Sequence, residues 1–279
     1  MSSIKSLLAN ATNTLANHSD SPVLDAEVLL CFVLHKPRSY LRAWCDNTLT
    51  DQQQSDFTAL IEQRQQGIPI AYLTGTREFW SRDFVVTPDV LIPRPDTELL
   101  IELSLELITK QKAVRILDLG TGSGIIAITL AAECPHAQVI AVDASLAALK
   151  VAQHNAQQHQ LTNIAFYHSD WFANVPNQLF DLVISNPPYI DKDDEHLQQG
   201  DVRFEPKSAL IANDDGLSDI KIIASAAQNY LVHSGHLLIE HGYNQARQAQ
   251  AIFNALHYDK VHTYPDLSRQ PRVTHGQKP

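Results

Sequence analysis

Residues 117–125 read LDLGTGSGI, three glycines spaced two apart directly after an apolar run. The preceding residues have the composition of a buried strand, and residues 125–134 have that of a helix. Glycine lets the backbone take positive φ and approach a ligand closely. A turn between a strand and a helix lies at the edge where open α/β sheets bind ligands. The stretch therefore predicts a ligand-binding loop in an α/β fold.

Strands and helices alternate from this loop to the end of the chain. Strands are predicted at 113–120, 137–144, 163–170, 180–186, 235–242, 260–266 and 271–277, and helices at 96–108, 123–134, 145–159, 216–232 and 244–256. Such alternation predicts a doubly wound, mostly parallel, seven-stranded Rossmann-like sheet. The last two strands are joined too briefly for a parallel crossover, so one of them should be antiparallel.

The first part of the chain has only helical signals. Ser21 and Pro22 form a start signal, Thr50 and Gln53 have the spacing of a capping box, and Gly67 is a natural stop. Aromatic and β-branched residues with turn signals then predict a hairpin. We expect three parts: a helical-bundle domain at 1–75, a hairpin linker at 76–95 and the α/β domain at 96–279.

Composition narrows the class of protein. Of the 279 residues, 44% are hydrophobic and 19% charged, which is typical of soluble globular chains, and no apolar run reaches membrane-spanning length. The N-terminus lacks a secretory pattern, and Cys31, Cys45 and Cys134 lack metal-ligand spacing. We expect a cytoplasmic monomer without a metal. The net charge of −10 and the lack of a basic cluster disfavour nucleic acid as substrate and suit a basic protein partner.

Asp143 ends the strand after the glycine loop, about 20 residues on, where an acid accepts hydrogen bonds from a ribose diol. This pattern predicts an adenosine-containing cofactor. A dinucleotide fingerprint needs glycine at position 125, where this chain has Ile125. Asp118 would repel a pyrophosphate and attract the sulfonium and ammonium groups of S-adenosylmethionine. S-adenosylmethionine is therefore favoured over a dinucleotide or a simple packing turn.

Trp171, in HSDWF at 168–172, follows the third strand of the predicted sheet. Its ring is expected over the same edge, at the adenine end of the cofactor, where it would stack on or edge the base. The alternative is a tryptophan that caps the hydrophobic core.

The stretch SNPPYI at 185–190 ends the fourth strand, beside the glycine loop. A planar amide or amino nitrogen is a poor nucleophile, so its hydrogens must be held for its lone pair to face a methyl donor. Asn186 Oδ1 and the Pro187 carbonyl each accept one hydrogen, and Tyr189 covers the flat face. This chemistry needs no strong base. The alternative is a plain turn, because prolines end a strand by themselves.

The motifs DLGTGSG, VDAS and NPPY resemble those of S-adenosylmethionine-dependent methyltransferases that act on planar nitrogens. The chain is similar, over nearly its whole length, to the family of peptide chain release factor glutamine methyltransferases (PrmC/HemK). AEVLL, GTREFW, LIPRPDTE, SDWF, GDVRFEP and DDGLSDI carry this resemblance. It implies transfer to the glutamine of the Gly-Gly-Gln motif of class 1 release factors, which supports translation termination. It also implies that the helical domain docks the release factor.

The resemblance assigns site residues as well. It implies cofactor contacts from Gly120, Thr121, Gly122, Ser123, Gly124, Asp143, Trp171 and Asn186, and a glutamine site made of Asn186, Pro187, Pro188 and Tyr189. We expect Arg94, Asp96 and Arg203 to order the wall of the site, unless Asp96 only caps the next helix. The alternatives are a ribosomal-protein glutamine methyltransferase, a nucleic-acid amino methyltransferase and a non-catalytic S-adenosylmethionine-binding protein.

Overall fold

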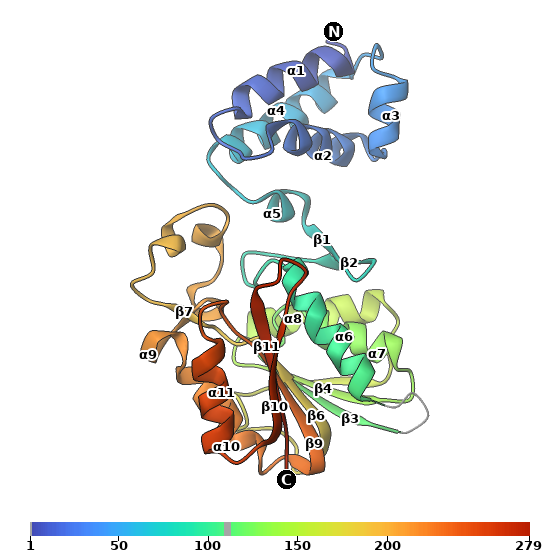
Figure 1. Ribbon diagram of the computed structural model, residues 1–279. Helices are drawn as coiled ribbons and strands as arrows, with labels where there is room; N and C mark the ends of the chain where they lie inside the picture. The colour runs from blue at the N-terminus through green and yellow to red at the C-terminus, as the bar shows by residue number, and fades with distance from the viewer. Residues whose placement is uncertain (1, 109–112) are drawn as a thin grey trace. The chain divides into compact units, whose positions relative to one another are not determined.

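The computed structural model describes residues 2–108 and 113–279. The chain divides into two compact units (Figure 1). The first contains residues 1–76 and, from much later in the chain, 198–204, and the second contains 77–197 and 205–279. No sequence pattern pointed to the later segment of the first unit.

Five α-helices among the described residues surround the core of the first unit. These are α1 (Ile4–Leu15), α2 (Pro22–Leu34), α3 (Arg38–Ala43), α4 (Asp51–Gln65) and α5 (Ile70–Thr74). The predicted caps of α4 are confirmed: Thr50 and Gln53 form a capping box, and Gly67 follows with φ +92°. Ser21 precedes α2 without a side-chain cap, and Pro22 is its first residue. Ile4, Leu15, Leu29, Leu30 and Phe57 are among the core side chains.

A partly buried arginine joins the two chain segments of the first unit. Arg64 pairs with Asp25 at 2.7 Å and with Asp201 at 3.2 Å. The 3₁₀ helix η3 (Val202–Phe204) follows, and the Arg203 guanidinium stacks over the Phe204 ring. A Cβ at Gly67 would lie 1.7 Å from Arg203 Nη2, so glycine permits this close approach.

A two-stranded sheet forms where the hairpin was predicted, from β1 (Thr76–Phe79) and β2 (Arg82–Val85). Trp80 and Ser81 both have positive φ, as a tight two-residue hairpin turn requires. Side-chain carboxylates stabilise this turn, because Trp80 N donates to Glu98 and Ser81 N donates to Glu78.

The second unit contains the predicted seven-stranded sheet, in the order β10-β11-β9-β6-β3-β4-β5. The strands are β3 (Arg115–Leu119), β4 (Gln138–Asp143), β5 (Ile164–His168), β6 (Phe180–Ser185), β9 (Leu231–Glu240), β10 (Asp259–Pro265) and β11 (Pro271–Gln277). Strand β11 is antiparallel to both neighbours, and the other adjacent pairs are parallel. The fold prediction is confirmed, including its single antiparallel strand.

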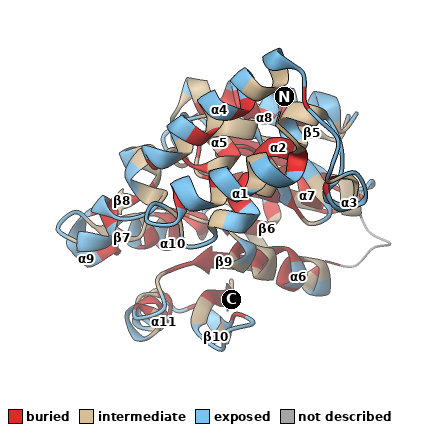
Figure 2. Ribbon diagram, turned by 90° about the horizontal axis from the view of Figure 1, so that it is seen from above, coloured by how far each residue is buried: buried red, intermediate tan, exposed pale blue. Residues whose placement is uncertain are grey.

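Helices cover both faces of this sheet. They are α6 (Glu98–Leu107), α7 (Ile125–Glu133), α8 (Leu146–Gln158), α10 (Ser218–Ala227) and α11 (Ala246–Ala255). Ile116 packs in the core cluster of α6 and α7, whereas its neighbour Leu117 packs in that of α10 and α11. This alternation follows from the two-residue period of a strand. Figure 2 shows β9 largely buried between the layers.

The structure differs from the sequence prediction at the end of α10. The predicted helix ran to residue 232, but α10 ends at Ala227, and Leu231 already belongs to β9, where it pairs with Phe180. Apolar residues suit both elements, so composition could not place this boundary. The short elements were also missed: the two-residue strands β7 (Ile190–Asp191) and β8 (Ile211–Ala212), η1 (Pro95–Thr97), η2 (Glu195–Gln198), η4 (Lys207–Ala209) and α9 (Asn213–Gly216).

Candidate active site

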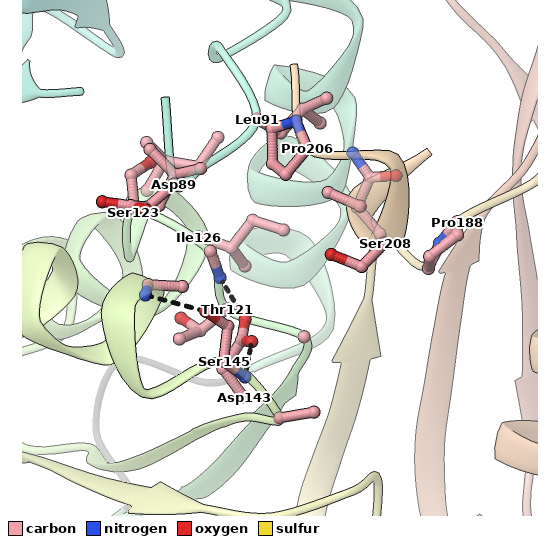
Figure 3. Close-up of a pocket in the computed structure, with 18 of the residues that line it drawn as sticks. Asp89, Leu91, Thr121, Ser123, Ile126, Asp143, Ser145, Pro188, Pro206 and Ser208 are labelled. Atoms are coloured by element: carbon pink, nitrogen blue, oxygen red, sulfur yellow. Dashed lines mark hydrogen bonds between the residues drawn. The ribbon is translucent and has the colours of Figure 1, made fainter. Parts of the chain in front are cut away.

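A cavity of about 390 Å³ opens at the carboxyl ends of β3, β4 and β6, within the second unit. Its walls come from residues within 89–97, 120–126, 143–148, 169–171, 186–188, 206–211 and at 219. Figure 3 shows Thr121, Asp143 and Ser145 on one side, and Pro188, Pro206 and Ser208 on another. Its volume is in the range of small-molecule sites.

The glycine loop forms one side of this cavity. Gly120 N and Thr121 N both donate to the Val142 carbonyl at 2.9 Å, which fixes the loop against the next strand. Gly122 has φ +57°, and a Cβ there would meet no atom within 4 Å. Gly124 has φ +88°, and a Cβ there would lie 2.6 Å from Ile128 Cδ1. The loop therefore needs Gly122 for its conformation and Gly124 for packing as well.

Asp143 lies under the loop with both carboxylate oxygens engaged. Oδ2 accepts from Gly122 N and Oδ1 accepts from Ser145 N, each at 2.8 Å (Figure 3). Burial raises the pKa of Asp143, and these hydrogen bonds oppose the rise. A carboxylate has about four acceptor positions. Acceptor positions thus remain for hydroxyl donors in the cavity.

Trp171 lines the cavity and also packs against the core. Its Cζ3 would lie 3.3 Å from a Cβ at Gly120, so the ring covers the glycine loop. Burial raises the pKa of Asp219, and a hydrogen bond with the Trp171 side chain opposes that rise. The two alternatives for Trp171 therefore both describe its position.

Asn186 and Pro188 face the same cavity as the glycine loop. Asn186 Nδ2 donates to Thr97 Oγ1 at 3.2 Å, which leaves Oδ1 for another donor. Tyr189 is half-buried, and its hydroxyl donates to Glu240 Oε1 at 3.4 Å. Among the described residues, Gly124, Pro187 and Tyr189 are not part of the cavity lining. The other predicted cofactor and glutamine-site residues meet at this one cavity.

An ion pair with a buried carboxylate joins two wall segments. The Glu205 side chain is fully buried, pairs with Arg94 and accepts from Ile92 N at 3.0 Å. It thereby joins residues 89–97 to residues 205–211, and Arg94 itself lines the cavity. The prediction for Arg94 as a wall residue agrees with this position.

Asp96 and Arg203 have different positions from those expected. Asp96 pairs with Arg272 at 3.2 Å and makes no side-chain cap for α6. Arg203 is part of the first unit and, within the described ranges, is not among the cavity-lining residues. All three residues lie in the stretches that carry the family resemblance, but only Arg94 lines the cavity among the described residues.

Family models match two parts of the chain. The PrmC N-terminal domain matches residues 6–75, and the Methyltransferase small domain matches residues 96–209. Release factor glutamine methyltransferase from Aliivibrio fischeri is 46% identical over 99% of this chain and 97% of its own length. The chain belongs to the release factor glutamine methyltransferase family. The Escherichia coli enzyme of that name is 48% identical over 93% of each chain.

Solved structures share the fold over much of this chain. A methyltransferase from Pyrococcus furiosus has a TM-score of 0.54 and 15% identity, over 80% of this chain and 98% of its own. The T. thermophilus 16S rRNA N2 G1207 methyltransferase, solved with AdoMet and guanosine, has a TM-score of 0.54 and 18% identity, over 73% of this chain and 50% of its own. At these identities the likeness shows the fold alone.

Asp118 does not occupy the position expected for a direct cofactor contact. Its side chain is fully buried, accepts from the Thr121 hydroxyl at 2.6 Å and, among described residues, is outside the cavity lining. Burial raises its pKa to about 7. Asp118 therefore stabilises the glycine loop through its hydrogen bond with Thr121. Its carboxyl group could attract a cationic ligand in the cavity electrostatically, without direct contact.

Three residues of the site were missed: Thr97, Glu205 and Glu240. Thr97 and Glu205 belong to the quoted stretches LIPRPDTE and GDVRFEP, but no periodicity or spacing gave either a role. All three have partners that are distant in sequence. Thr97 bonds to Asn186, Glu205 pairs with Arg94, and Glu240 accepts from Tyr189. Such long-range pairs leave no local pattern.

Two features are absent from the part of the chain that the structure describes. No helix among residues 2–108 and 113–279 is long and apolar enough to cross a membrane. Within those residues there is also no cluster of three or more His, Cys, Asp or Glu side chains suited to a metal ion.

Proposed function

We propose that this protein methylates the side-chain amide nitrogen of the glutamine in the Gly-Gly-Gln motif of class 1 peptide chain release factors. It uses S-adenosyl-L-methionine, produces S-adenosyl-L-homocysteine and acts in translation termination in the cytoplasm. One observation carries the proposal: in a chain of this family, Asn186 and Pro188 line the same cavity as Gly122 and Asp143.

The cavity residues suit an adenosine-containing sulfonium cofactor. Asp143 retains acceptor positions for a ribose diol, and Trp171 offers a ring beside the loop for the adenine. The open space above Gly122 admits the amino-acid end of the cofactor. When bound, S-adenosylmethionine supplies an electrophilic methyl group. We assign its contacts to Gly120, Thr121, Gly122, Ser123, Gly124, Asp143, Trp171 and Asn186.

The acceptor glutamine is oriented by the NPPY segment. Asn186 Oδ1 accepts one amide hydrogen and the Pro187 carbonyl accepts the other, so the nitrogen lone pair faces the methyl group. Pro188 and Tyr189 complete the glutamine site, with the Tyr189 ring against its flat face. Fixed acceptors favour the charge that develops on nitrogen in the transition state. The alkylated nitrogen then loses its proton to water or a nearby acceptor, without a dedicated base.

The helical unit supplies the contact to the release factor. We assign residues 1–75 to docking, 76–95 to a hairpin linker and 96–279 to catalysis. Leu24 and Phe32 expose 43% and 41% of their surfaces on α2, and we assign these two apolar side chains to the contact with a protein partner. The net charge of −10 suits a partner with a basic surface.

A labelling experiment tests this function. The purified protein is incubated with methyl-labelled S-adenosylmethionine and, separately, with release factor, ribosomes or DNA. We expect label on the release factor, and none when its Gly-Gly-Gln glutamine is changed to alanine. Label on a ribosomal protein or on nucleic acid alone would support the corresponding alternative and refute the proposal.

A further inference from the structure

Glu240 is a buried carboxyl group that the proposed chemistry does not use. It ends β9 and is 1% exposed. Its Oε1 accepts from the Tyr189 hydroxyl at 3.4 Å. No hydrogen bond of ordinary geometry reaches its Oε2 within the described residues, and a hydrogen-bonding contact of the Thr97 side chain with the carboxyl group lowers the pKa of Glu240. Two hydroxyl groups thus meet at one carboxyl group behind the NPPY segment.

A threonine hydroxyl has one hydrogen, so when it donates that hydrogen to a carboxylate it cannot also donate to another neighbour. An ionised carboxylate accepts hydrogen bonds and cannot donate them. If the Thr97 hydrogen points to Glu240, then Thr97 Oγ1 can only accept from its other neighbour. That neighbour is the Asn186 side chain, whose Nδ2 lies 3.2 Å away. The carboxylate therefore determines which end of the Asn186 amide faces Thr97.

The opposite orientation of Asn186 would harm the acceptor site. A neutral donor at position 240 would let Thr97 turn its hydrogen toward Asn186, and the amide would then turn its Oδ1 to Thr97. Its NH₂ group would face the cavity, where the substrate amide also presents hydrogens. Two facing donors repel each other, so the glutamine nitrogen would lose one of its two acceptors.

We propose that Glu240 is a positioning residue which, through Thr97, holds the Asn186 side chain with Oδ1 toward the acceptor nitrogen. This inference rests on the proposed function for the identity of the acceptor. Thr97 and Asn186 line the cavity, whereas Glu240 is buried and, among the described residues, is not part of the lining. Glu240 also accepts a hydrogen bond from the Tyr189 hydroxyl, so it fixes the direction in which this second NPPY side chain donates.

Burial, together with the groups around Glu240, brings its pKa close to neutral pH. Burial raises the pKa of Glu240 to about 7, and Asp96 of η1 adds to the rise. Arg272 of β11 and the hydroxyls of Thr97 and Tyr189 oppose it. His241, the next residue after β9, bonds to Thr274 and to the Gly242 carbonyl. The ionised form, which sets the direction of the hydrogen bonds, thus gains population as pH rises through about 7.

The test compares Glu240→Gln with the wild-type protein on purified release factor. Glutamine keeps the shape but adds a donor and removes the ionisation. We expect kcat to fall at least tenfold, with the Kd for S-adenosylmethionine within twofold of wild type. The rise of wild-type kcat with a midpoint near pH 7 should disappear. Wild-type kcat and pH profile in this variant would overturn the inference.

Thr97 provides a matched pair of variants. Thr97→Val keeps the shape without the hydroxyl and should lose activity as Glu240→Gln does. Thr97→Ser keeps the hydroxyl and should retain most of the wild-type kcat. Equal losses in both variants would mean that Thr97 acts only by packing, which contradicts the proposed chain of hydrogen bonds.

A second readout does not depend on turnover. The side-chain amide signals of Asn186, assigned by their loss in Asn186→Asp, should shift with a midpoint near pH 7 in the wild type and not in Glu240→Gln. Signals that do not respond to pH in the wild type would refute the inference. If release factor receives no label from the wild type while the Asn186 signals titrate, the proposed function fails and the positioning role of Glu240 stands.

Discussion

Asn186 follows β6 beside the glycine loop and faces the cavity, so the proposed cofactor and acceptor sites converge on it. Asn186→Ala removes one of the two acceptors for the amide hydrogens. We expect kcat to fall by about 10²- to 10³-fold, as when one polar group of a preorganised site is removed. The Kd for S-adenosylmethionine, measured by calorimetry, should remain within a few-fold of wild type.

Asn174→Ala is the matched control for this change, since Asn174 Nδ2 donates to the His168 carbonyl at an exposed position outside the cavity lining. Its turnover should equal that of the wild type. Near-normal turnover of Asn186→Ala would contradict the assignment of two acceptors to the NPPY segment.

Residue-level prediction agreed with the structure where the position of a side chain follows from its own segment. Asp143, Trp171 and Asn186 all line the cavity, as expected from their places at strand ends. It failed where the role depends on a distant partner. The Asp96 carboxylate pairs with Arg272, which belongs to the last strand of the chain, and no local pattern in either segment indicates this pair.

At the scale of elements, the glycine loop offers two substitutions that differ in one respect. Gly122→Ala and Gly124→Ala both place a side chain at positive φ, which costs about 1–2 kcal/mol. Only Gly124→Ala also drives a Cβ to 2.6 Å from Ile128 Cδ1 and 3.1 Å from Ala152 Cβ. We therefore expect a larger loss of unfolding free energy for Gly124→Ala, by about 1–3 kcal/mol in urea denaturation.

Gly122→Ala should have the larger effect on ligand binding. The space above Gly122 is open, and we assign it to the cofactor, so a methyl group there would meet the ligand. We expect the Kd for S-adenosylmethionine to rise at least tenfold. If Gly122→Ala and Gly124→Ala lose equal stability, and Gly122→Ala leaves the Kd for S-adenosylmethionine unchanged, the assignment of this loop to cofactor binding is wrong.

The elements with strong periodicity were predicted well, and the weak ones were not. The capping box of α4 and the strands β3 to β6 follow local rules of hydrogen bonding and burial. The pair β7 and β8 has two residues in each strand, too few for a period to be recognised. Their pairing joins Ile190 to Ile211 and Asp191 to Ala212, and tertiary contacts decide it.

At the scale of the whole molecule, the buried carboxyl group of Asp118 makes stability depend on pH. Its pKa is about 7 in the folded chain, against 3.8 for an unperturbed aspartate side chain. Because the folded pKa is raised, its contribution is fully present below about pH 4 and is lost as pH rises through 7. At about 1.36 kcal/mol per pKa unit, the total loss is up to about 4 kcal/mol.

Asp118→Asn should remove this dependence. Its unfolding free energy, relative to wild type, should increase between about pH 4 and pH 8 by up to about 4 kcal/mol in urea denaturation. Glu102→Gln, which replaces an exposed carboxyl group of α6, is the control and should show no such trend. A constant difference between Asp118→Asn and wild type across this range would mean that Asp118 is ionised throughout.

The proposed function assigns docking to the helical unit and methyl transfer to the second unit. If the helical unit docks the release factor, then its exposed apolar residues bind protein and take no part in methyl transfer. Leu24→Ser with Phe32→Ser should raise KM for release factor about thirtyfold, because each of the two lost apolar contacts costs about 1 kcal/mol and about 1.4 kcal/mol is a factor of ten. The kcat at saturating release factor and the Kd for S-adenosylmethionine should not change. Leu179→Ser, at a 44% exposed position of the catalytic unit, should leave all three constants at wild-type values. An unchanged KM in the double variant would show that the partner does not contact Leu24 and Phe32 of α2. A loss of kcat or of cofactor binding would show that docking and catalysis do not belong to separate units as proposed.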